Sequence, residues 1–462
     1  MTSVSQPSVR SEDAALAELR AVEAELDRRW PESRIEPSLT RIAALADLLG
    51  SPQRCYPVLH IAGTNGKTSV ARMLDALLSR IGLRVGRYTS PHLQHVTERI
   101  SVDGARISPE RYIEVYRDIE PYVGLIDAGS PVAMSKFEVL TGMAFAAFAD
   151  APVEAAVVEV GLGGSWDATN VADAVVAAIT PVAVDHTNYL GSDLAGIAEE
   201  KAGIIKPGSV AVLARQSPEA ARVIAARSIE VGATVAREGI EFGVLEREIA
   251  IGGQRLRLQG LGGVYDEVFL PLHGAHQAHN AVLALAAAEA FFGAGGSRSL
   301  DIDAVREAFA AVTVPGRLER VRAAPTVWLD SAHNPHGAGA LAAALREEFA
   351  FRKLVAVVGV MRDKDARGIL GALAPAIDEL VLTSAGSPRA MDVEELAAAA
   401  ADTSGDSPLT IEPRLPDAIE AAIASATGDG PGSGDVSGAG VIITGSVAMV
   451  GEARTYFGHD PR

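Results

Sequence analysis

Residues 58–70 read Val-Leu-His-Ile-Ala-Gly-Thr-Asn-Gly-Lys-Thr-Ser-Val and decide the fold of the first half of the chain. An apolar strand leads into a loop with Gly63 and Gly66, and the pair Lys67-Thr68 opens an apolar helix. Glycines let such a loop fold so tightly that its amides point at phosphate oxygens, and the helix that follows adds its free amides and its dipole. Lys67 is placed to neutralise phosphate charge, and Thr68 to approach a bound magnesium ion. The stretch predicts a site for a nucleoside triphosphate.

This loop is a shortened variant of the Walker pattern, because Ile61 stands where that pattern has a glycine five residues before Gly66. The alternative interpretation is a tight strand-to-helix turn whose lysine is only solvated. The order of strand, two glycines, Lys-Thr and helix favours phosphate binding. The expected ATP contacts in the loop are Gly63, Thr64, Asn65, Gly66, Lys67 and Thr68.

The composition indicates several hydrophobic cores and excludes some partners. The chain has 462 residues, which is too long for one ordinary domain. Of these residues 48% are hydrophobic, enough to fill more than one core. Its net charge of −18 argues against nucleic acid, since phosphate backbones need dense Lys and Arg. Cys55 is the single cysteine, which excludes an internal disulfide and fits a reducing cytoplasm.

No targeting or membrane segment is expected. Met1 to Asp13 is polar and lacks the apolar centre of a signal peptide. No uninterrupted apolar run reaches the roughly 20 residues that cross a bilayer. We therefore expect a cytoplasmic protein with no membrane partner.

The hydrophobic pattern predicts two α/β domains. After amphipathic helices at 14–30 and 39–49, short apolar runs alternate with helical stretches, which is typical of a mainly parallel sheet covered by helices. Residues 241–272 are punctuated by glycines and indicate an antiparallel hairpin region attached to that sheet. The break at 314–317 starts a second α/β series, so we expect domains at 1–313 and 314–462. Residues 427–440 are expected to form a mobile surface loop.

Three further residues carry chemistry. Glu159 ends an apolar strand, and a buried carboxylate is costly unless a cation such as magnesium or a core donor satisfies it; both interpretations stay open. His186 follows another strand end, where ligands gather in open α/β sheets, although a lone histidine is more often packing and magnesium prefers oxygen. Lys201 lies near the end of a helix at 193–206 that, by charge pattern alone, is an ordinary charged helix with ion pairs.

A resemblance to a known family covers most of the chain, from about residue 36 to 446. The motifs are GTNGKTS (63–69), YTSPH (88–92), TERI (97–100), EVGLGG (159–164), DATN (167–170), DHT (185–187), EKAGI (200–204), PGRLE (315–319) and DSAHNP (330–335). Together they resemble folylpolyglutamate synthase/dihydrofolate synthase of the Mur ligase superfamily. The resemblance implies an α/β fold with a P-loop ATP-binding domain of the Mur ligase type, a small antiparallel insertion and a C-terminal Rossmann-like α/β domain.

The activity implied by the resemblance is an ATP-dependent amide ligase. A carboxylate of a pterin-containing acceptor is phosphorylated by ATP, and the amine of L-glutamate displaces phosphate from this acyl phosphate. The expected acceptors are dihydropteroate, tetrahydrofolate and folate polyglutamates, with both synthase activities in one chain. ATP is a co-substrate, Mg²⁺ the expected cofactor, and a monomer the expected state.

The resemblance also assigns roles to individual residues. It assigns Ser90, Glu159 and His186 as the ligands of Mg²⁺. It also assigns Lys201 as a carbamylated lysine (N6-carboxylysine), a modification that turns a cation into a carboxylate-like ligand. Lys67, Lys201 and His333 are the expected catalytic residues, with His333 ordering glutamate or phosphate. The further ATP contacts are Asn280 for the adenine, and Arg317 and Asp330. The expected pterin site comprises Glu36, Pro37, Ser38, Phe137, Trp166, Asp167 and Ala168. Phe137 and Trp166 offer flat faces for stacking, although core packing explains them equally well.

Two features depart from the family pattern. Thr68 stands where many members have glycine, and Trp166 stands where Arg or Leu is frequent, so the hydroxyl near the phosphate and the preferred acceptor are open.

Three other functions share some of these features. A folylpolyglutamate synthase that does not act on dihydropteroate differs only in its acceptor. A cell-wall Mur ligase that acts on a UDP-MurNAc-peptide carries a nucleotide-sugar domain before the phosphate loop, whereas 62 helix-rich residues precede Gly63 here. A nucleotide switch or scaffold does not need Glu159, His186, Lys201 and Asp330 together.

Overall fold

The computed structural model describes residues 12–30, 36–293, 299–403, 408–428 and 438–461. The polar start of the chain at 1–11 and most of the predicted loop at 427–440 lie outside these residues. Within the described chain, no helix combines the length and the apolar character that a membrane span requires.

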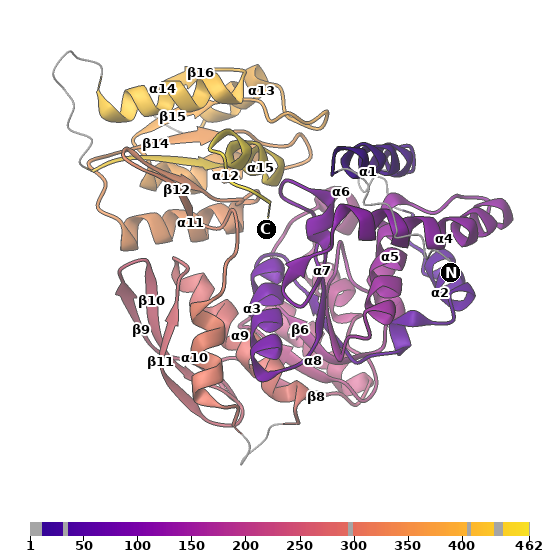
Figure 1. Cartoon of the computed structure of the whole chain (residues 1–462). Coiled ribbons are helices and arrows are strands. Elements are labelled where there is room, and N and C mark those ends of the chain that lie inside the picture. The colour runs from indigo at the N-terminus through magenta and orange to yellow at the C-terminus, as the bar shows by residue number, and fades with distance from the viewer. Residues whose placement is uncertain (1–11, 31–35, 294–298, 404–407, 429–437, 462) are drawn as a thin grey trace, which may run out of the picture.

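Two large sheets organise the chain (Figure 1). The first has eight strands in the order β4-β3-β2-β5-β1-β6-β7-β8, and the second has six in the order β12-β13-β17-β14-β15-β16. We call the parts of the chain that carry these sheets the first lobe (described residues up to 310) and the second lobe (from 319). Residues 311–318 connect them without helix or strand.

The eight-stranded sheet is parallel except at the edge formed by β3 and β4. β1 lies between β5 and β6, so its carboxyl end opens at the centre of the sheet. Its strands are β1 Val58–Ala62, β2 Val85–Tyr88, β3 Ile100–Val102, β4 Ala105–Arg106, β5 Ala155–Glu159, β6 Ala174–Ile179, β7 Val210–Leu213 and β8 Thr234–Arg237.

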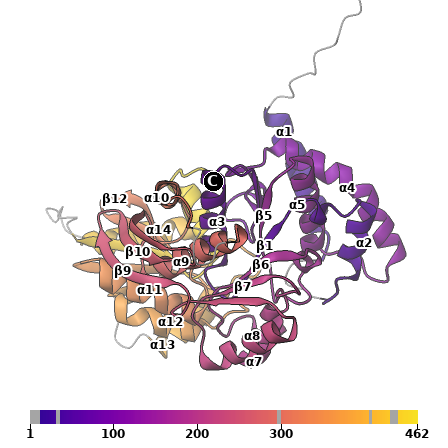
Figure 2. The same cartoon turned by 90° about the horizontal axis from the view of Figure 1, so that it is seen from below.

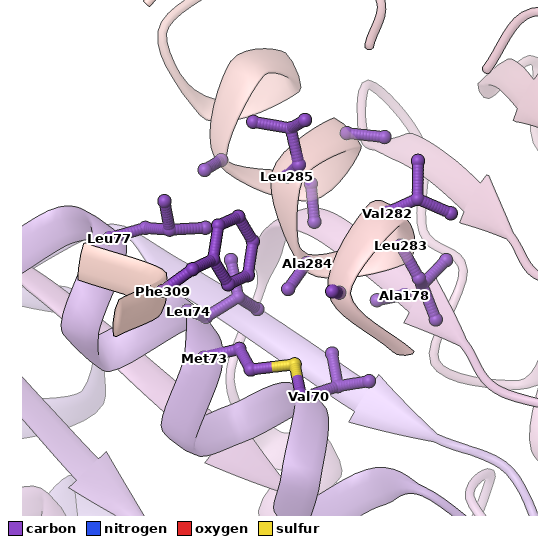
Figure 3. Close-up of a cluster of buried hydrophobic side chains, with 14 of the residues drawn as sticks. Val70, Met73, Leu74, Leu77, Ala178, Val282, Leu283, Ala284, Leu285 and Phe309 are labelled. Atoms are coloured by element: carbon purple, nitrogen blue, oxygen red, sulfur yellow. The ribbon is translucent and has the colours of Figure 1, made fainter. Parts of the chain in front are cut away.

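Side chains alternate between the two faces of this sheet, and each face has its own core. Leu59 and Ile61 of β1 pack with α3 (Lys67–Ile81), α9 (Ala275–Phe291) and α10 (Ile302–Ala310), as Figure 3 shows for part of this cluster. Val58 faces the opposite core. The helices on that face are α1 Glu12–Asp27, α2 Thr40–Leu48, α4 Pro109–Gly129, α5 Lys136–Asp150, α7 Leu194–Ala202 and α8 Pro218–Glu230, with the short α6 Thr187–Leu190 before α7. Figure 2 shows α1, α2, α4 and α5 on the side of the first lobe away from the second.

Residues 241–272 form a separate three-stranded antiparallel sheet. Its strands are β9 Gly243–Ala250, β10 Gly253–Gln259 and β11 Val264–Leu270. The expectation of hairpins attached to the main sheet was wrong in this respect, because the apolar side chains of β10 and β11 pack on α9 and α10 instead of extending the ladder. In Figure 1 this small sheet lies beneath the second lobe.

In the second lobe, β12 runs antiparallel at one edge and the other five strands are parallel. Its strands are β12 Glu319–Ala323, β13 Thr326–Leu329, β14 Lys353–Val358, β15 Glu379–Leu382, β16 Leu409–Ile411 and β17 Ala439–Thr444. Helices α11 Pro335–Glu348, α12 Ala366–Leu373 and α13 Val393–Ala401 cover one face, and α14 Leu415–Thr427 and α15 Val447–Tyr456 cover the other. This is the predicted mainly parallel α/β arrangement.

Candidate active site

A cavity of about 590 Å³ opens between the two lobes. The phosphate loop after β1 and the segments after β5 and β6 form its first-lobe wall. The second lobe supplies His333, Lys364, Arg389 and the start of α15, and the connection between the lobes supplies Arg317. Carboxyl ends of parallel strands meet at one edge of a sheet, which explains why residues distant in sequence gather here.

The phosphate loop is held by close backbone contacts. Gly66 has φ +93°, and a Cβ atom there would lie 2.5 Å from Oδ1 of Asn280, so glycine is required on both grounds. The side chain of Thr64 accepts a hydrogen bond from the amide of Ala183 at 3.0 Å and donates one to its carbonyl at 2.9 Å. These contacts tie the loop to the segment that follows β6.

Lys67 lies over the loop that carries it. Its ammonium donates to the carbonyl oxygens of Gly63 and Thr64, each at 3.2 Å, and it lines the cavity. Burial lowers the pKa of Lys67, and the nearby carboxylates of Glu159 and Asp185 oppose this. The ammonium group therefore lies between the loop that carries it and the cavity.

Glu159 is a buried carboxylate with only 2% exposure at the end of β5. Burial raises the pKa of this carboxyl, and the positive charge of Lys67 and the hydroxyl of Thr68 lower it. Thr68 Oγ1 lies 3.0 Å from each carboxylate oxygen, and Ser90 beside it lines the same cavity. A carboxylate held by hydroxyl and amide donors, at the edge of a phosphate site, fits the oxygen-rich environment that Mg²⁺ prefers.

Among the described residues, no group of three or more His, Cys, Asp and Glu is close enough to hold a metal without other ligands.

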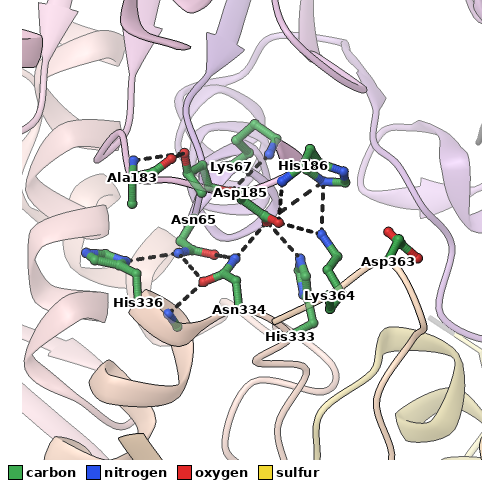
Figure 4. Close-up of polar contacts among 12 residues, drawn as sticks. Asn65, Lys67, Ala183, Asp185, His186, His333, Asn334, His336, Asp363 and Lys364 are labelled. Carbon is green, nitrogen blue, oxygen red and sulfur yellow. Dashed lines mark hydrogen bonds and ion pairs between the residues drawn. The ribbon is translucent and has the colours of Figure 1, made fainter. Parts of the chain in front are cut away.

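Asp185 lies at the centre of a polar cluster that joins the lobes (Figure 4). Lys364 Nζ of the second lobe lies 2.6 Å from Asp185 Oδ1 and 3.3 Å from Nε2 of His186. Burial opposes the charge of Asp185, but Lys364 and the neighbouring imidazoles hold its pKa below the usual range. Burial, with the charge of Lys364, lowers the pKa of His186 to about 3, so this imidazole is neutral at physiological pH.

Lys201 points inward from α7. Its side chain is 5% exposed and lines the cavity, so the interpretation of an ordinary charged helix was wrong for this residue. Burial, with the charge of Lys67, lowers its pKa to about 7. The adjacent Glu200 instead accepts hydrogen bonds from the amides of Gly164 and Trp166. α7 is thus fixed to the glycine-rich segment after β5.

Another part of the first-lobe wall of the cavity is aromatic and acidic. The expected pterin residues that line it are Glu36, Ser38, Phe137, Trp166, Asp167 and Ala168. Burial raises the pKa of Asp167 to about 6, although amides of Leu162 and Thr169 donate to its carboxylate. Phe137 and Trp166 are half-buried on the wall, so they are not simply core aromatics.

Three predicted site residues do not line the cavity. Pro37 is exposed. Asn280 is buried behind Gly66, where its amide donates to Gln277. Asp330 is buried beneath the interlobe connection, where its carboxylate accepts from the amides of Leu318 and Ala332.

The structure adds residues that the sequence did not single out. Lys364 follows β14, and its place after a strand end is the signal that could have found it. Arg41 and Glu138 form a buried ion pair on the cavity wall, with Arg41 Nε 3.0 Å from Oε1 of Glu138. No local pattern predicted that pair, because the partners are separated by 97 residues.

Comparison with known proteins agrees with this architecture. The Mur ligase middle domain matches residues 61–288, and the Mur ligase glutamate ligase domain matches residues 316–447. The dihydrofolate synthase/folylpolyglutamate synthase of Mycobacterium tuberculosis is 60% identical over 465 residues, covering 97% of this chain and 95% of that protein. The protein of the same name from Escherichia coli is 33% identical, covering 78% of this chain and 81% of that protein.

Two solved structures extend the comparison. M. tuberculosis folylpolyglutamate synthase complexed with ADP and AMPPCP has a TM-score of 0.91 and 59% identity, covering 97% of this chain and 100% of that chain. E. coli FolC in complex with DHPP and ADP has a TM-score of 0.82 and 30% identity, covering 96% of this chain and 98% of that chain.

Fold, phosphate loop and interlobe cavity together define an ATP-dependent ligase of the Mur type. The chain belongs to the dihydrofolate synthase/folylpolyglutamate synthase family of these ligases.

Proposed function

We propose that this enzyme joins L-glutamate to dihydropteroate, and in a second activity adds γ-linked glutamates to tetrahydrofolate and its polyglutamates. The observation that carries the proposal is one cavity that holds a phosphate loop, a cationic second-lobe wall and an aromatic wall. Lys67 represents the first of these, Lys364 with the neighbouring Arg317 of the connection the second, and Phe137 the third. A nucleotide, an anionic intermediate and a flat acceptor ring need these three environments side by side.

In the proposed reaction, an oxygen of the acceptor carboxylate attacks the γ-phosphorus of ATP, and ADP leaves. The amine of glutamate then attacks the acyl carbon, phosphate leaves, and the amine loses a proton as the amide forms. Lys67, Arg317 and Lys364 neutralise negative charge along this path, and positioning supplies much of the rate. Enclosure between the lobes keeps water from hydrolysing the acyl phosphate.

We propose that Ser90, Glu159 and His186 hold Mg²⁺ together with the nucleotide. The ion supplies charge neutralisation and orientation for the phosphates. Lys201 is proposed to be carbamylated, which its burial and its pKa of about 7 support, because only a neutral amine reacts with CO₂. His333 is proposed to order glutamate or phosphate from the second lobe.

We further propose that residues 1–313 and 314–462 act as the two domains of a cytoplasmic monomer. Asn280 and Asp330 are proposed to act on ATP from the edges of the site. Pro37 is proposed to act on the pterin through its neighbours Glu36 and Ser38.

An ADP-release assay tests the proposal. We expect ADP only when L-glutamate is present together with dihydropteroate or, in a separate reaction, tetrahydrofolate, and we expect mass spectrometry to find one added glutamate per ADP. ADP release in the tetrahydrofolate reaction but not in the dihydropteroate reaction would indicate a folylpolyglutamate synthase that lacks the first activity. Release that needs neither acceptor would contradict the ligase reaction.

Lys67→Ala is the matched loss-of-function variant. Without the ammonium over the phosphate loop we expect kcat to fall at least 100-fold, which corresponds to about 2.7 kcal/mol of transition-state stabilisation. Exposed Arg367 of the second lobe forms an ion pair with exposed Asp402 and is not among the cavity-lining residues, so Arg367→Ala is the control that should keep full activity.

A further inference from the structure

The side-chain amide of Asn334 joins three segments at the boundary between the lobes (Figure 4). Asn334 immediately precedes α11 in the second lobe and is 1% exposed. Its Nδ2 donates to Oδ1 of Asn65 at 3.0 Å and to Oδ2 of Asp185 at 2.9 Å. Its Oδ1 accepts from Nδ2 of Asn65 at 3.0 Å and from the amide of Gly337 at 2.8 Å.

These contacts use the whole hydrogen-bonding capacity of the amide, which has two donors and two acceptor positions. The orientation of the group is therefore fixed. Turning it over would place the amide oxygen against the Asp185 carboxylate and the NH₂ group against the Gly337 amide. Asparagine alone among the side chains of this length both donates twice and accepts twice.

The segments that Asn334 joins serve different parts of the proposed reaction. Asn65 lies in the phosphate loop, Asp185 precedes His186 and binds Lys364, and Gly337 lies in the first turn of α11. A second bond fixes the same loop residue, since Nδ2 of Asn65 lies 2.9 Å from Nδ1 of His336. The position of the second lobe is thus transmitted directly to the phosphate loop.

We propose that Asn334 is a positioning residue that couples closure of the lobes to the geometry of the phosphate loop. This inference rests on the proposed function. When the second lobe docks, the Asn65–Asn334 amide pair sets the loop and the Asp185 segment in register with Lys364 and the other second-lobe groups. Nucleotide binding to the first lobe does not require the pair, whereas phosphoryl transfer to the acceptor does.

Substitution by aspartate separates this role from helix capping. Asn334→Asp keeps an oxygen for the Gly337 amide, and aspartate is as good an N-cap as asparagine. It removes both donors and puts a carboxylate against that of Asp185. We expect kcat to fall at least tenfold and KM for ATP to change less than threefold. Asn334→Ala, which also loses the cap, should show the same kcat.

Asp392→Ala is the control for a lost cap. Asp392 caps α13 of the same lobe through the amide of Glu394 and lies outside the cavity. We expect it to lower the melting temperature without changing kcat more than twofold at 25 °C. An equal loss of kcat in this control would overturn the proposal, because it would trace the effect to lobe stability.

The partner residue tests the pair from the other lobe. Asn65→Ala should reduce kcat in the same way, and the double variant Asn65→Ala/Asn334→Ala should lose no more than the worse single one, since both remove one interaction. Losses that multiply would overturn the proposal and assign Asn65 to ATP alone.

Small-angle scattering supplies a readout other than activity. With an ATP analogue and acceptor bound, the wild-type lobes should close, and Asn334→Asp should keep a larger radius of gyration. Equal closure or an unchanged kcat in Asn334→Asp would refute the coupling. An inactive wild-type enzyme would instead refute the proposed function.

Discussion

The hydroxyl of Thr68, in the first turn of α3, bridges the two carboxylate oxygens of Glu159 at the end of β5, at 3.0 Å from each. This contact places the only hydroxyl of the Lys67-Thr68 pair between the phosphate loop and the buried acid. The carboxylate at the end of β5 is thereby tied to the helix that follows the phosphate loop.

Glu159→Gln should make the folded protein more stable and the enzyme less active. Burial raises the pKa of Glu159 above its ordinary value of 4.5, so the free energy of unfolding decreases as the pH rises from 4.5 through the raised pKa of the folded state. The neutral amide avoids that loss. We expect unfolding at pH 7 without ligands to cost about 1 kcal/mol more than in the wild type, with kcat at least 100-fold lower. Urea unfolding and the ADP assay measure both; a variant that is less stable and fully active would contradict the metal-binding role.

Removal of CO₂ should inactivate the enzyme if Lys201 is carbamylated. Its pKa of about 7 in the folded protein leaves most of the amine neutral at pH 8, whereas the ordinary value of 10.5 would not. CO₂ restored at a constant partial pressure should recover activity, and faster as the pH rises through about 7, because the neutral fraction of the amine increases while the dissolved CO₂ stays constant. Lys201→Ala should be inactive and partly rescued by a short carboxylic acid such as acetate. Full activity of this variant without rescue would exclude a carbamate role.

Gly161→Ala should weaken binding of the pterin acceptor and spare ATP. A Cβ atom at Gly161 would lie 2.4 Å from Cζ of Phe137, and both residues line the cavity, so the ring must shift from its place on the wall. We expect KM for dihydropteroate to rise at least tenfold and KM for ATP to change less than threefold. Gly124→Ala, in an exposed helical position with no atom within 4 Å of the added carbon, is the control. A change in KM for ATP alone would place the nucleotide against Phe137.

Arg454→Ala should destabilise the contact between α15 and the first lobe. The guanidinium is 1% exposed, lies 2.9 Å and 3.1 Å from the two oxygens of Glu319, and also donates to Gln94 of the first lobe. Breaking a buried pair leaves a charge without its partner, and we expect a loss of about 3 kcal/mol in urea unfolding. The exposed pair of Arg367 and Asp402 is the control, and Arg367→Ala should cost less than about 0.5 kcal/mol. Equal losses would show that the burial of Arg454 contributes nothing.

The local pattern predicted the strands that carry the site closely. The apolar runs at 58–61, 155–160, 174–179, 210–213 and 379–382 predict strands; β6, β7 and β15 have these bounds, and β1 and β5 differ from them by one residue. β9 and β12 are among the strands that the pattern missed, because each is an exposed or half-buried edge strand in which charged residues interrupt the apolar pattern. The apolar pattern predicts a helix over 279–292, and α9 spans Ala275–Phe291, with Asn280 behind the phosphate loop.

By itself the sequence determined the α/β order, the phosphate loop and the family, because each follows from short-range spacing: a two-residue period for strands, a 3.6-residue period for helices, and glycines where a tight loop needs them. Only the tertiary structure decided that Lys201 faces the cavity, that Lys364 reaches Asp185, and that the amide of Asn334 meets that of Asn65. The last two contacts join residues 179 and 269 positions apart. Their geometry depends on how two separately folded sheets pack against each other, and no periodicity within either segment carries that information.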